Sequence, residues 1–574
     1  MFTKLKFLYF ISLLILLETT AHCGTLFLAT PQKNNTGSML VSYSIDRRTD
    51  PNIYYEKARQ HKKDERRILS SIPFSSDIEE NAHSALLSIP EISETHAYLR
   101  AEYGIINDAG LCIGVSEPQT SREVSKPPLA ENLILNSRDL SYLLLERCEN
   151  AQDALNMATK LIDTYGLYGE SAAFVIADSK EAFYLEMLPG TEKEKGFYAA
   201  KRIGSGQFLV SADQFRLQDL YVGDTDFVLP ADLRARFIRA GFDKGLDEEM
   251  NFQKDAGGIE KRPYYSLRRV WRALTLVDPA SKLKPQVKNY DTKDYPLTVS
   301  VKEPLDVKRL FELHRDTYRG TQFDNSTRDT GGLFASPYTY EDFGERTINS
   351  TNSTYTFVID LNAAHPKPVV WVALGSPGES TFIPLTLGEL PQTLAKTSAE
   401  RYSKDKIFWL NRNISMLCHG HFSALSDYVR TKIMELEQRS LTLIKQSARL
   451  SPERFDRVIV KNVDTNYRRI SNLYADTLEK YDGGYMLRYA EGHEPKSAPI
   501  KYRRAKHSKE QVLSVKETPP VPKTQKQHTA SFKENNRSNS FLQVTKTLER
   551  LINEFLPRSL THNVHKHDKK TSTN

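Results

Sequence analysis

Cys23 is the residue of this chain with the clearest potential for chemistry, because of its position. It follows Lys4 and Lys6, an apolar run over residues 7–17 and a short polar stretch over 18–22. A positive segment followed by about 11 apolar residues is typical of a secretory signal, because a membrane span needs about 20. We therefore expect residues 1–22 to be a signal peptide, and the mature protein to be secreted or extracytoplasmic.

Cleavage before Cys23 would place a thiol and a free α-amine on one residue. The reference pKa of an α-amine is about 7.7–8.0 and that of a thiol about 8.5, so the neutral amine can accept the thiol proton near neutral pH. Such a residue is a nucleophile with its own base. Position alone leaves two other interpretations open: a lipid-attachment cysteine of a lipoprotein, or a chance thiol.

The other cysteines do not suggest a metal centre or a disulfide scaffold. Cys112, Cys148 and Cys418 have no CxxC or His/Cys spacing typical of zinc sites. Cys112 and Cys148 are expected to be small buried hydrophobic residues. We predict no metal and no organic cofactor.

Charge divides the chain into two parts. The 574 residues carry a formal net charge of +7, but residues 501–574 alone contain 16 Lys and Arg against 6 Asp and Glu. The remaining residues are therefore slightly acidic, which argues against nucleic acid as a partner. Residues 496–574 are predicted to be a basic, low-complexity tail, either a solvated appendage or a contact for an anionic surface.

Between these ends, the patterns alternate in blocks of strands and helices. Runs over 24–29 and 39–44 flank a turn-rich segment and predict a hairpin, and 172–177 and 182–187 predict a second one. Residues 137–165 predict two helices, with Asn150 as an N-cap, and 421–447 predict a long helix. Residues 50–95 show no clear pattern. The fold class is therefore α+β, with no membrane span after the signal.

Several motifs in order resemble the dipeptidase A/secernin family of N-terminal-nucleophile (Ntn) cysteine hydrolases over most of residues 23–450. They include the segments 37–46 (GSMLVSYSID), 94–98 (ETHAY), 107–114 (NDAGLCIG), 165–170 (YGLYGE), 211–214 (SADQ), 264–273 (YYSLRRVWRA) and 318–324 (YRGTQFD). The resemblance implies a four-layer αββα sandwich of antiparallel sheets over residues 23–495. It also implies hydrolysis of dipeptides through Cys23 and a thioester acyl-enzyme.

The same resemblance implies roles for a few other residues. Asp46 would orient the amino terminus or bind the ammonium group of the substrate, and Arg47 lies next to it. Asp213 stands where the family has an oxyanion-binding Asn. Arg268 and Arg269 either clamp the carboxylate of a dipeptide or pair with acids between the layers. His96 and His314 are expected to be structural, and Glu117 and Glu170 to be surface or turn residues.

Three departures from the family pattern bear on the mechanism. Gly24 stands where the family has Thr directly after the nucleophile, and Tyr43 replaces an Arg that is common near the nucleophile in many members. An ionised Asp213 would oppose a developing oxyanion.

The sequence thus predicts an exported cysteine-type dipeptidase acting on short peptides. It leaves two alternatives open: an amidase or acylase acting on non-peptide amides, and a catalytically lapsed binding protein.

Overall fold

The computed structural model describes residues 24–33, 37–69, 87–120, 133–220, 225–242, 250–257, 264–287, 294–338, 345–362, 364–394 and 401–489, with the side chains of 483–489 left out. All of these residues lie in the first of two compact units of the chain, 1–497 and 498–574. Cys23, the predicted signal peptide and the whole of the predicted tail, which starts at residue 496, lie outside the described residues.

The first sheet, sheet A, carries the strand nearest to Cys23. It has seven strands in the order β16-β14-β1-β2-β17-β18-β19, and every pair is antiparallel. Strand β1 lies between β14 and β2, so the chain directly after Cys23 runs through the interior of the sheet. The strands are β1 (Leu26–Ala29), β2 (Leu40–Ile45), β14 (Gln207–Ser211), β16 (Thr298–Ser300), β17 (Tyr355–Asp360), β18 (Val369–Leu374) and β19 (Ile383–Leu385).

The second sheet, sheet B, has eight strands in the order β15-β13-β12-β11-β10-β9-β8-β3, also antiparallel throughout. Its strands are β3 (Tyr54–Glu56), β8 (Tyr98–Arg100), β9 (Gly104–Asn107), β10 (Cys112–Ser116), β11 (Ala172–Ala177), β12 (Ala182–Pro189), β13 (Gly196–Arg202) and β15 (Phe227–Val228). Two short ribbons lie between β3 and β8 in the chain. They pair β4 (Arg59–Gln60) with β7 (Glu94–Thr95), and β5 (Arg66–Ile68) with β6 (Ser88–Pro90).

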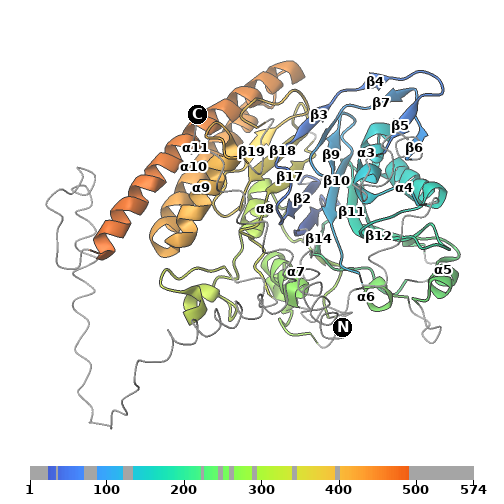
Figure 1. The fold of residues 1–574 in the computed structure, drawn as a ribbon, viewed down its shortest axis with the longest axis horizontal. Coiled ribbons are helices and arrows are strands. Elements are labelled where there is room, and N and C mark those ends of the chain that lie inside the picture. The colour runs from blue at the N-terminus through green and yellow to red at the C-terminus, as the bar shows by residue number, and fades with distance from the viewer. Residues whose placement is uncertain are drawn as a thin grey trace, which may run out of the picture. The chain divides into compact units, whose positions relative to one another are not determined.

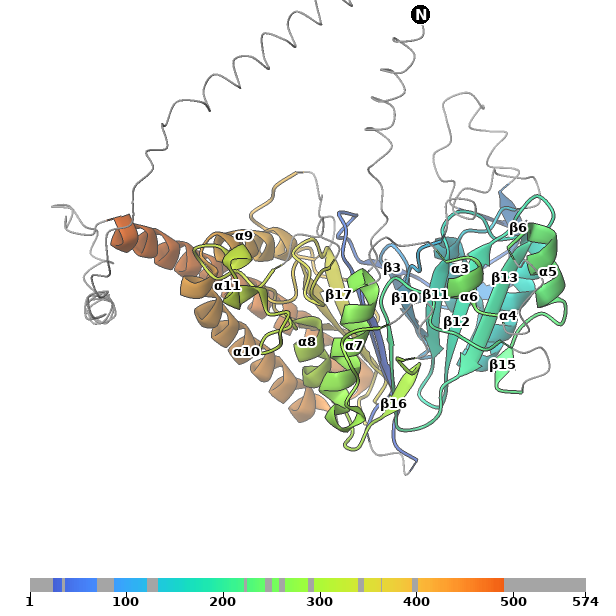
Figure 2. The same ribbon diagram turned by 90° about the horizontal axis from the view of Figure 1, so that it is seen from below.

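The helices fall into two groups by the sheet that they contact. Helices α3, α4 and α5 contact sheet B, whereas α7, α8, α9, α10 and α11 contact sheet A (Figures 1 and 2). The helices are α3 (Ser137–Arg147), α4 (Ala151–Tyr165), α5 (Leu233–Ala240), α6 (Phe252–Asp255), α7 (Tyr264–Val277), α8 (Val307–His314), α9 (Ile407–Gly420), α10 (Phe422–Ser447) and α11 (Pro452–Tyr489). The short 3₁₀ turns are η1 (Pro279–Ser281), η2 (Asn325–Thr327) and η3 (Asp329–Gly331).

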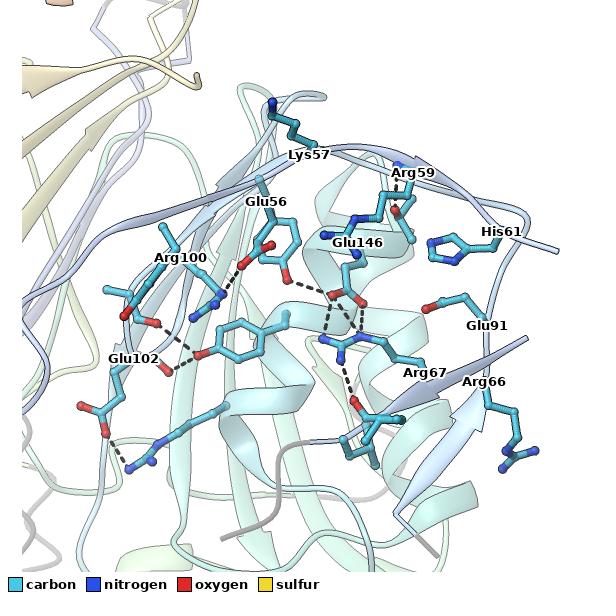
Figure 3. A pocket seen from close by; sticks show the side chains of 18 of the residues that line it. Glu56, Lys57, Arg59, His61, Arg66, Arg67, Glu91, Arg100, Glu102 and Glu146 are labelled. Carbon is cyan, nitrogen blue, oxygen red and sulfur yellow. Dashed lines mark hydrogen bonds and ion pairs between the residues drawn. The ribbon is translucent and has the colours of Figure 1, made fainter. Parts of the chain in front are cut away.

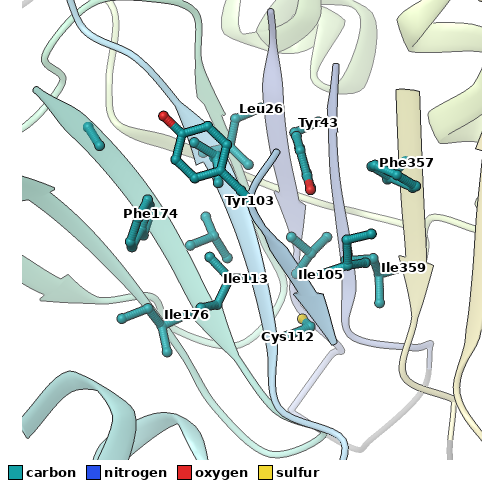
Figure 4. Close-up of a cluster of buried hydrophobic side chains, with 14 of the residues drawn as sticks. Leu26, Tyr43, Tyr103, Ile105, Cys112, Ile113, Phe174, Ile176, Phe357 and Ile359 are labelled. Carbon is teal, nitrogen blue, oxygen red and sulfur yellow. The ribbon is translucent and has the colours of Figure 1, made fainter. Parts of the chain in front are cut away.

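Apolar side chains fill the space between the two sheets. Leu26 and Phe357 of sheet A and Ile113 and Phe174 of sheet B are fully buried there (Figure 4). The sheets approach closely at Gly114, where a Cβ atom would lie 2.6 Å from Val41 Cγ1. Burial of this apolar area stabilises the packing of the two sheets against each other.

Most of the predicted elements are confirmed. Strands β1 and β2 pair as a hairpin, as do β11 and β12, and the side chain of Asn150 caps α4 by accepting a hydrogen bond from Asp153 N. The long helix predicted over 421–447 is α10. The α+β class is confirmed by helices packed against antiparallel sheets. Residues 50–95, which lacked a clear pattern, contain the short strands β3 to β7.

Candidate active site at the start of strand β1

The main chain at Gly24 and Thr25 is held by the hairpin of β1 and β2. Gly24 N donates to Ser44 O at 3.0 Å, and Thr25 N donates to Ser44 Oγ at 3.1 Å. A Cβ atom on residue 24 would lie 1.9 Å from Ser44 Oγ and 2.3 Å from Ser44 O. Only glycine fits so close an approach at position 24.

Arg269 of α7 connects this main chain to Asp213. Its Nη1 donates to Gly24 O at 3.1 Å and to Thr25 Oγ1 at 3.2 Å, and its Nη2 lies 2.8 Å from Asp213 Oδ2. The side chains of Arg269 and Asp213 are both fully buried. One guanidinium therefore spans the distance between the residue after Cys23 and the predicted oxyanion-site residue.

Arg346, which the sequence analysis did not single out, completes the cluster. Its Nη1 lies 2.8 Å from Asp46 Oδ2 and its Nη2 lies 3.5 Å from Asp213 Oδ2. The guanidinium groups of Arg269 and Arg346 both lie over the ring of Tyr265, at 5.1 and 5.3 Å from its centroid. We call Asp46, Arg346, Asp213 and Arg269 the inner ion-pair chain; it has two negative and two positive side chains.

Asp213 has an unusual backbone and an unusual carboxyl group. Its φ of 59° is in the left-handed region, which Asp and Asn tolerate better than most residues. Burial raises the pKa of the Asp213 carboxyl to about 6, although the adjacent Arg269 and Arg346 act in the opposite direction. At neutral pH the side chain is therefore mostly ionised, and an ionised carboxylate accepts hydrogen bonds but cannot donate one.

Asp46 is held by three neighbours. Its Oδ1 accepts from Ser353 Oγ at 2.5 Å, and its Oδ2 accepts from Ser44 Oγ at 3.1 Å in addition to Arg346. The residue is 1% exposed. Asp46 directly follows β2, and Ser44 connects its carboxylate to the main chain of Gly24 and Thr25.

Arg47 lies outside the inner ion-pair chain. Its Nη1 donates to Glu117 Oε2 at 2.6 Å and its Nη2 to Glu102 Oε1 at 2.6 Å, while Glu117 Oε1 also accepts from Tyr103 Oη at 2.6 Å. Glu117 is only 3% exposed, so its prediction as a surface or turn residue was wrong. No local pattern indicates this burial, because the partners Arg47 and Tyr103 lie 70 and 14 residues away in the chain.

The two adjacent arginines of α7 have different surroundings. Arg268 pairs with Glu345 at 3.0 Å and stacks on Phe323, 3.6 Å from the ring centroid. Arg269 faces Gly24 and Asp213. The structure therefore brings Cys23's neighbour Gly24 together with Asp46, Asp213 and Arg269, and it places Arg47 and Arg268 against other carboxylates.

The remaining candidates have structural contacts. His314 is fully buried with its Nε2 3.1 Å from Ser42 Oγ, and burial lowers its pKa to about 3, so its ring is neutral. His96 pairs with Asp108 at 2.6 Å. Cys112 and Cys148 are buried, as predicted. Within the described ranges, no cluster of His, Cys, Asp or Glu could hold a metal ion, and no helix is long and apolar enough to span a membrane.

A separate pocket of about 880 Å³ lies beside this site (Figure 3). Arg138, Tyr142 and Glu146, spaced four residues apart on α3, form one of its walls, and Arg67 lies opposite Glu146. The pocket is connected to Arg47 through Glu102, which pairs with both Arg47 and Arg138. We call it the α3 pocket; most of its side chains are charged, and many of these form ion pairs with one another.

The model of Peptidase family C69 matches residues 22–435, which is most of the chain. The chain therefore belongs to Peptidase family C69, and with it to the cysteine-type peptidases.

Two curated relatives have modest sequence identity to the chain. A protein named "Dipeptidase" from Bifidobacterium longum (strain NCC 2705) is 22% identical over 354 residues, covering 56% of this chain and 64% of the relative. "Dipeptidase A" from Lactobacillus helveticus is 21% identical over 379 residues, covering 62% of this chain and 74% of the relative. The match to the Bifidobacterium protein thus spans slightly less than two thirds of that protein.

Among solved structures, the chain is similar to a mutant of conjugated bile acid hydrolase from Clostridium perfringens, with 10% identity and a TM-score of 0.29. The aligned part covers 66% of this chain and 97% of the hydrolase. A second variant of the same hydrolase is 11% identical with a TM-score of 0.29, covering 63% and 92% of the two chains.

Proposed function

We propose that the protein is an exported dipeptidase whose nucleophile is the amino-terminal Cys23 of the mature chain. The observation that carries the proposal is the contact of Arg269 with both Gly24 O and Asp213 Oδ2. This contact fixes the main chain next to Cys23 beside a residue that the family resemblance places in the catalytic site. Family membership and the names of the two relatives support the peptidase chemistry.

In the proposed reaction, the α-amine of Cys23 takes the proton from its thiol. The thiolate attacks the scissile carbonyl carbon, and the amine returns the proton to the leaving nitrogen as the C–N bond breaks. The products of this half are a thioester on Cys23 and a free amino acid. Water, deprotonated by the same amine, then hydrolyses the thioester and releases the second amino acid and the thiol.

Two further parts of the proposal concern the fold and the compartment. Helices on the outer faces of two mutually contacting sheets support the four-layer αββα sandwich of Ntn hydrolases. The pattern of residues 1–22 supports export before cleavage. In this proposal the basic tail contacts an anionic surface and takes no part in hydrolysis.

A lapsed binding protein is the second candidate function, and the charge of Asp213 is the observation in its favour. An ionised carboxylate at an oxyanion site would oppose catalysis. Loss of one oxyanion donor alone costs about 10²–10³ in rate. This candidate predicts retention of peptides without turnover.

The first test is intact mass and amino-terminal sequencing of the exported protein, followed by a dipeptide assay. We expect an unmodified Cys23 as the first residue, and loss of hydrolysis in Cys23→Ala. Cys148→Ala is the matched control, because Cys148 is a buried thiol that packs in the core, and it should retain hydrolysis. A chain that begins elsewhere, a lipid on Cys23, or full activity in Cys23→Ala would contradict the proposal.

A further inference from the structure

The two aspartates of the inner ion-pair chain differ in one respect. Both oxygens of Asp46 are occupied, by Ser353 on one side and by Ser44 and Arg346 on the other. In Asp213 both arginines bind the same oxygen, Oδ2. Oδ1 of Asp213 is buried and has no hydrogen-bond partner among the residues that the structure describes.

A buried carboxylate oxygen without a partner is unfavourable, because it has lost its hydrogen bonds to water. It becomes favourable when a donor, above all a charged one, occupies the position. The backbone of Asp213 is fixed by Ser116 Oγ, which accepts from Asp213 N at 3.1 Å, and by Gln119 N, which donates to Asp213 O at 3.2 Å. The open acceptor is thus part of a rigid site.

The position of this acceptor relative to Cys23 suggests which donor it takes. Asp213 is separated from the main chain of Gly24 by a single guanidinium, that of Arg269. In a dipeptide, the ammonium nitrogen is only two bonds from the scissile carbonyl carbon. A carbonyl carbon within reach of Cys23 therefore carries its ammonium group into the neighbourhood of Asp213.

We propose that Asp213 Oδ1 binds the α-ammonium group of a dipeptide, so that the protein requires substrates with a free amino terminus. This inference rests on the proposed function and makes its substrate class more specific. It gives Asp213 a role in binding the substrate in place of a role in binding the oxyanion. This role would also make the site bind free peptides in preference to N-acylated amides, because the acyl oxygen of the latter would face the lone pairs of Oδ1.

Arg346 makes this arrangement possible as a positioning residue. Its guanidinium lies between Asp46 and Asp213 and, with Arg269, balances their two negative charges. Since Arg346 and Arg269 both bind Oδ2, they hold the carboxylate in one orientation and leave Oδ1 open. Two buried carboxylates could not otherwise remain ionised so close together.

The test measures binding of alanyl-alanine and N-acetyl-alanyl-alanine by calorimetry to the full mature chain carrying Cys23→Ala. At pH 7.0 both the peptide ammonium and the Asp213 carboxylate are mostly ionised. We expect the free dipeptide to bind about 10- to 100-fold more tightly than its acetylated form, the range for a hydrogen bond between charged groups. Adding Asp213→Asn should remove this difference.

Asn tolerates the left-handed φ of residue 213, so Asp213→Asn changes charge without backbone strain. If the single change prevents folding, Asp213→Asn combined with Arg346→Gln restores the charge balance of the inner ion-pair chain. The double variant should fold and should also bind both peptides equally.

Three results would overturn the inference: equal binding of the two peptides, binding of neither, or an equal loss for both in Asp213→Asn. The last would indicate that Oδ1 holds the α-amine of residue 23 itself. Turnover of alanyl-alanine by the unsubstituted chain tests the proposed function separately. Discrimination without turnover contradicts only the catalysis, and turnover without discrimination contradicts only the role of Asp213.

Discussion

The inner ion-pair chain and the α3 pocket both pair arginines with carboxylates at similar distances, but in different surroundings. Arg269 lies 2.8 Å from Asp213 with both side chains fully buried. Arg67 lies 2.9 Å from Glu146, with 27% and 8% of the two side chains exposed. Because water screens and solvates the more exposed charges, we expect burial rather than distance to decide what such a pair contributes to stability.

The difference in burial between the two groups of ion pairs also affects how each could bind a ligand. In the inner ion-pair chain every charge needs a partner. An acceptor oxygen that has no hydrogen bond within the described residues, such as Asp213 Oδ1, is therefore a strong candidate for ligand binding. In the α3 pocket, solvent can solvate any charge that is not paired. The following variants test this contrast, beginning with the largest expected effect.

Arg269→Met should reduce the free energy of unfolding by about 3–5 kcal/mol, because Asp213 would lose its closest buried partner. Chemical denaturation measures the loss. The matched control is Arg272→Met, three residues further along α7, where the pair with Asp316 is 14% and 11% exposed. A loss in Arg272→Met as large as that in Arg269→Met would show that burial does not distinguish the two pairs.

Glu186 allows a test of burial through pH. Burial raises the pKa of Glu186 to about 7, against backbone hydrogen bonds from Arg216 and Leu217 and a hydrogen bond from Tyr184 that lower it. In the window from about pH 4.5 to 7 the folded state therefore binds more protons than the unfolded state, and stability falls as pH rises. The shift corresponds to about 3 kcal/mol at most.

Glu186→Gln should remove this contribution, so that the unfolding free energy of the variant varies less between pH 4.5 and 7.5. The raised pKa of Asp213 leaves a slope of the same sign between about pH 4 and 6. Denaturation at a series of pH values measures both. An unchanged slope in Glu186→Gln would contradict the assignment to Glu186.

Arg67→Met tests the α3 pocket. Glu146 would retain the hydrogen bond from Tyr98 Oη at 2.8 Å and partial access to water. We expect a loss of about 1 kcal/mol in the free energy of unfolding. A loss equal to that of Arg269→Met would mean that water solvates the charges of the α3 pocket no better than those of the inner ion-pair chain.

The smallest effect is expected for Lys57→Ala. Lys57 lies 2.9 Å from Glu389, but 66% and 81% of these side chains are exposed. The midpoint of thermal unfolding should stay within experimental error, at low and at high salt. A clear shift at low salt would show that exposed pairs contribute more than the comparison implies.

Much of the local structure was determined by the sequence alone, because its signals act over a few residues. The hairpin of β1 and β2 followed from two apolar runs around a turn, and the start of α4 from an Asn that caps the helix. The motifs placed Asp46, Asp213 and Arg269 among the candidate residues, and the structure brings these three together around Gly24.

What only the tertiary structure decided is which charged groups meet. Arg268 and Arg269 are neighbours in sequence but point in different directions from α7, since successive residues of a helix are separated by about 100°. Arg346 joins Asp46 and Asp213 across long intervals of chain, and Glu117 is buried against Arg47 and Tyr103. No local pattern encodes such pairs: they depend on how the two sheets and α7 pack, and burial then determines their charge state and their open acceptors.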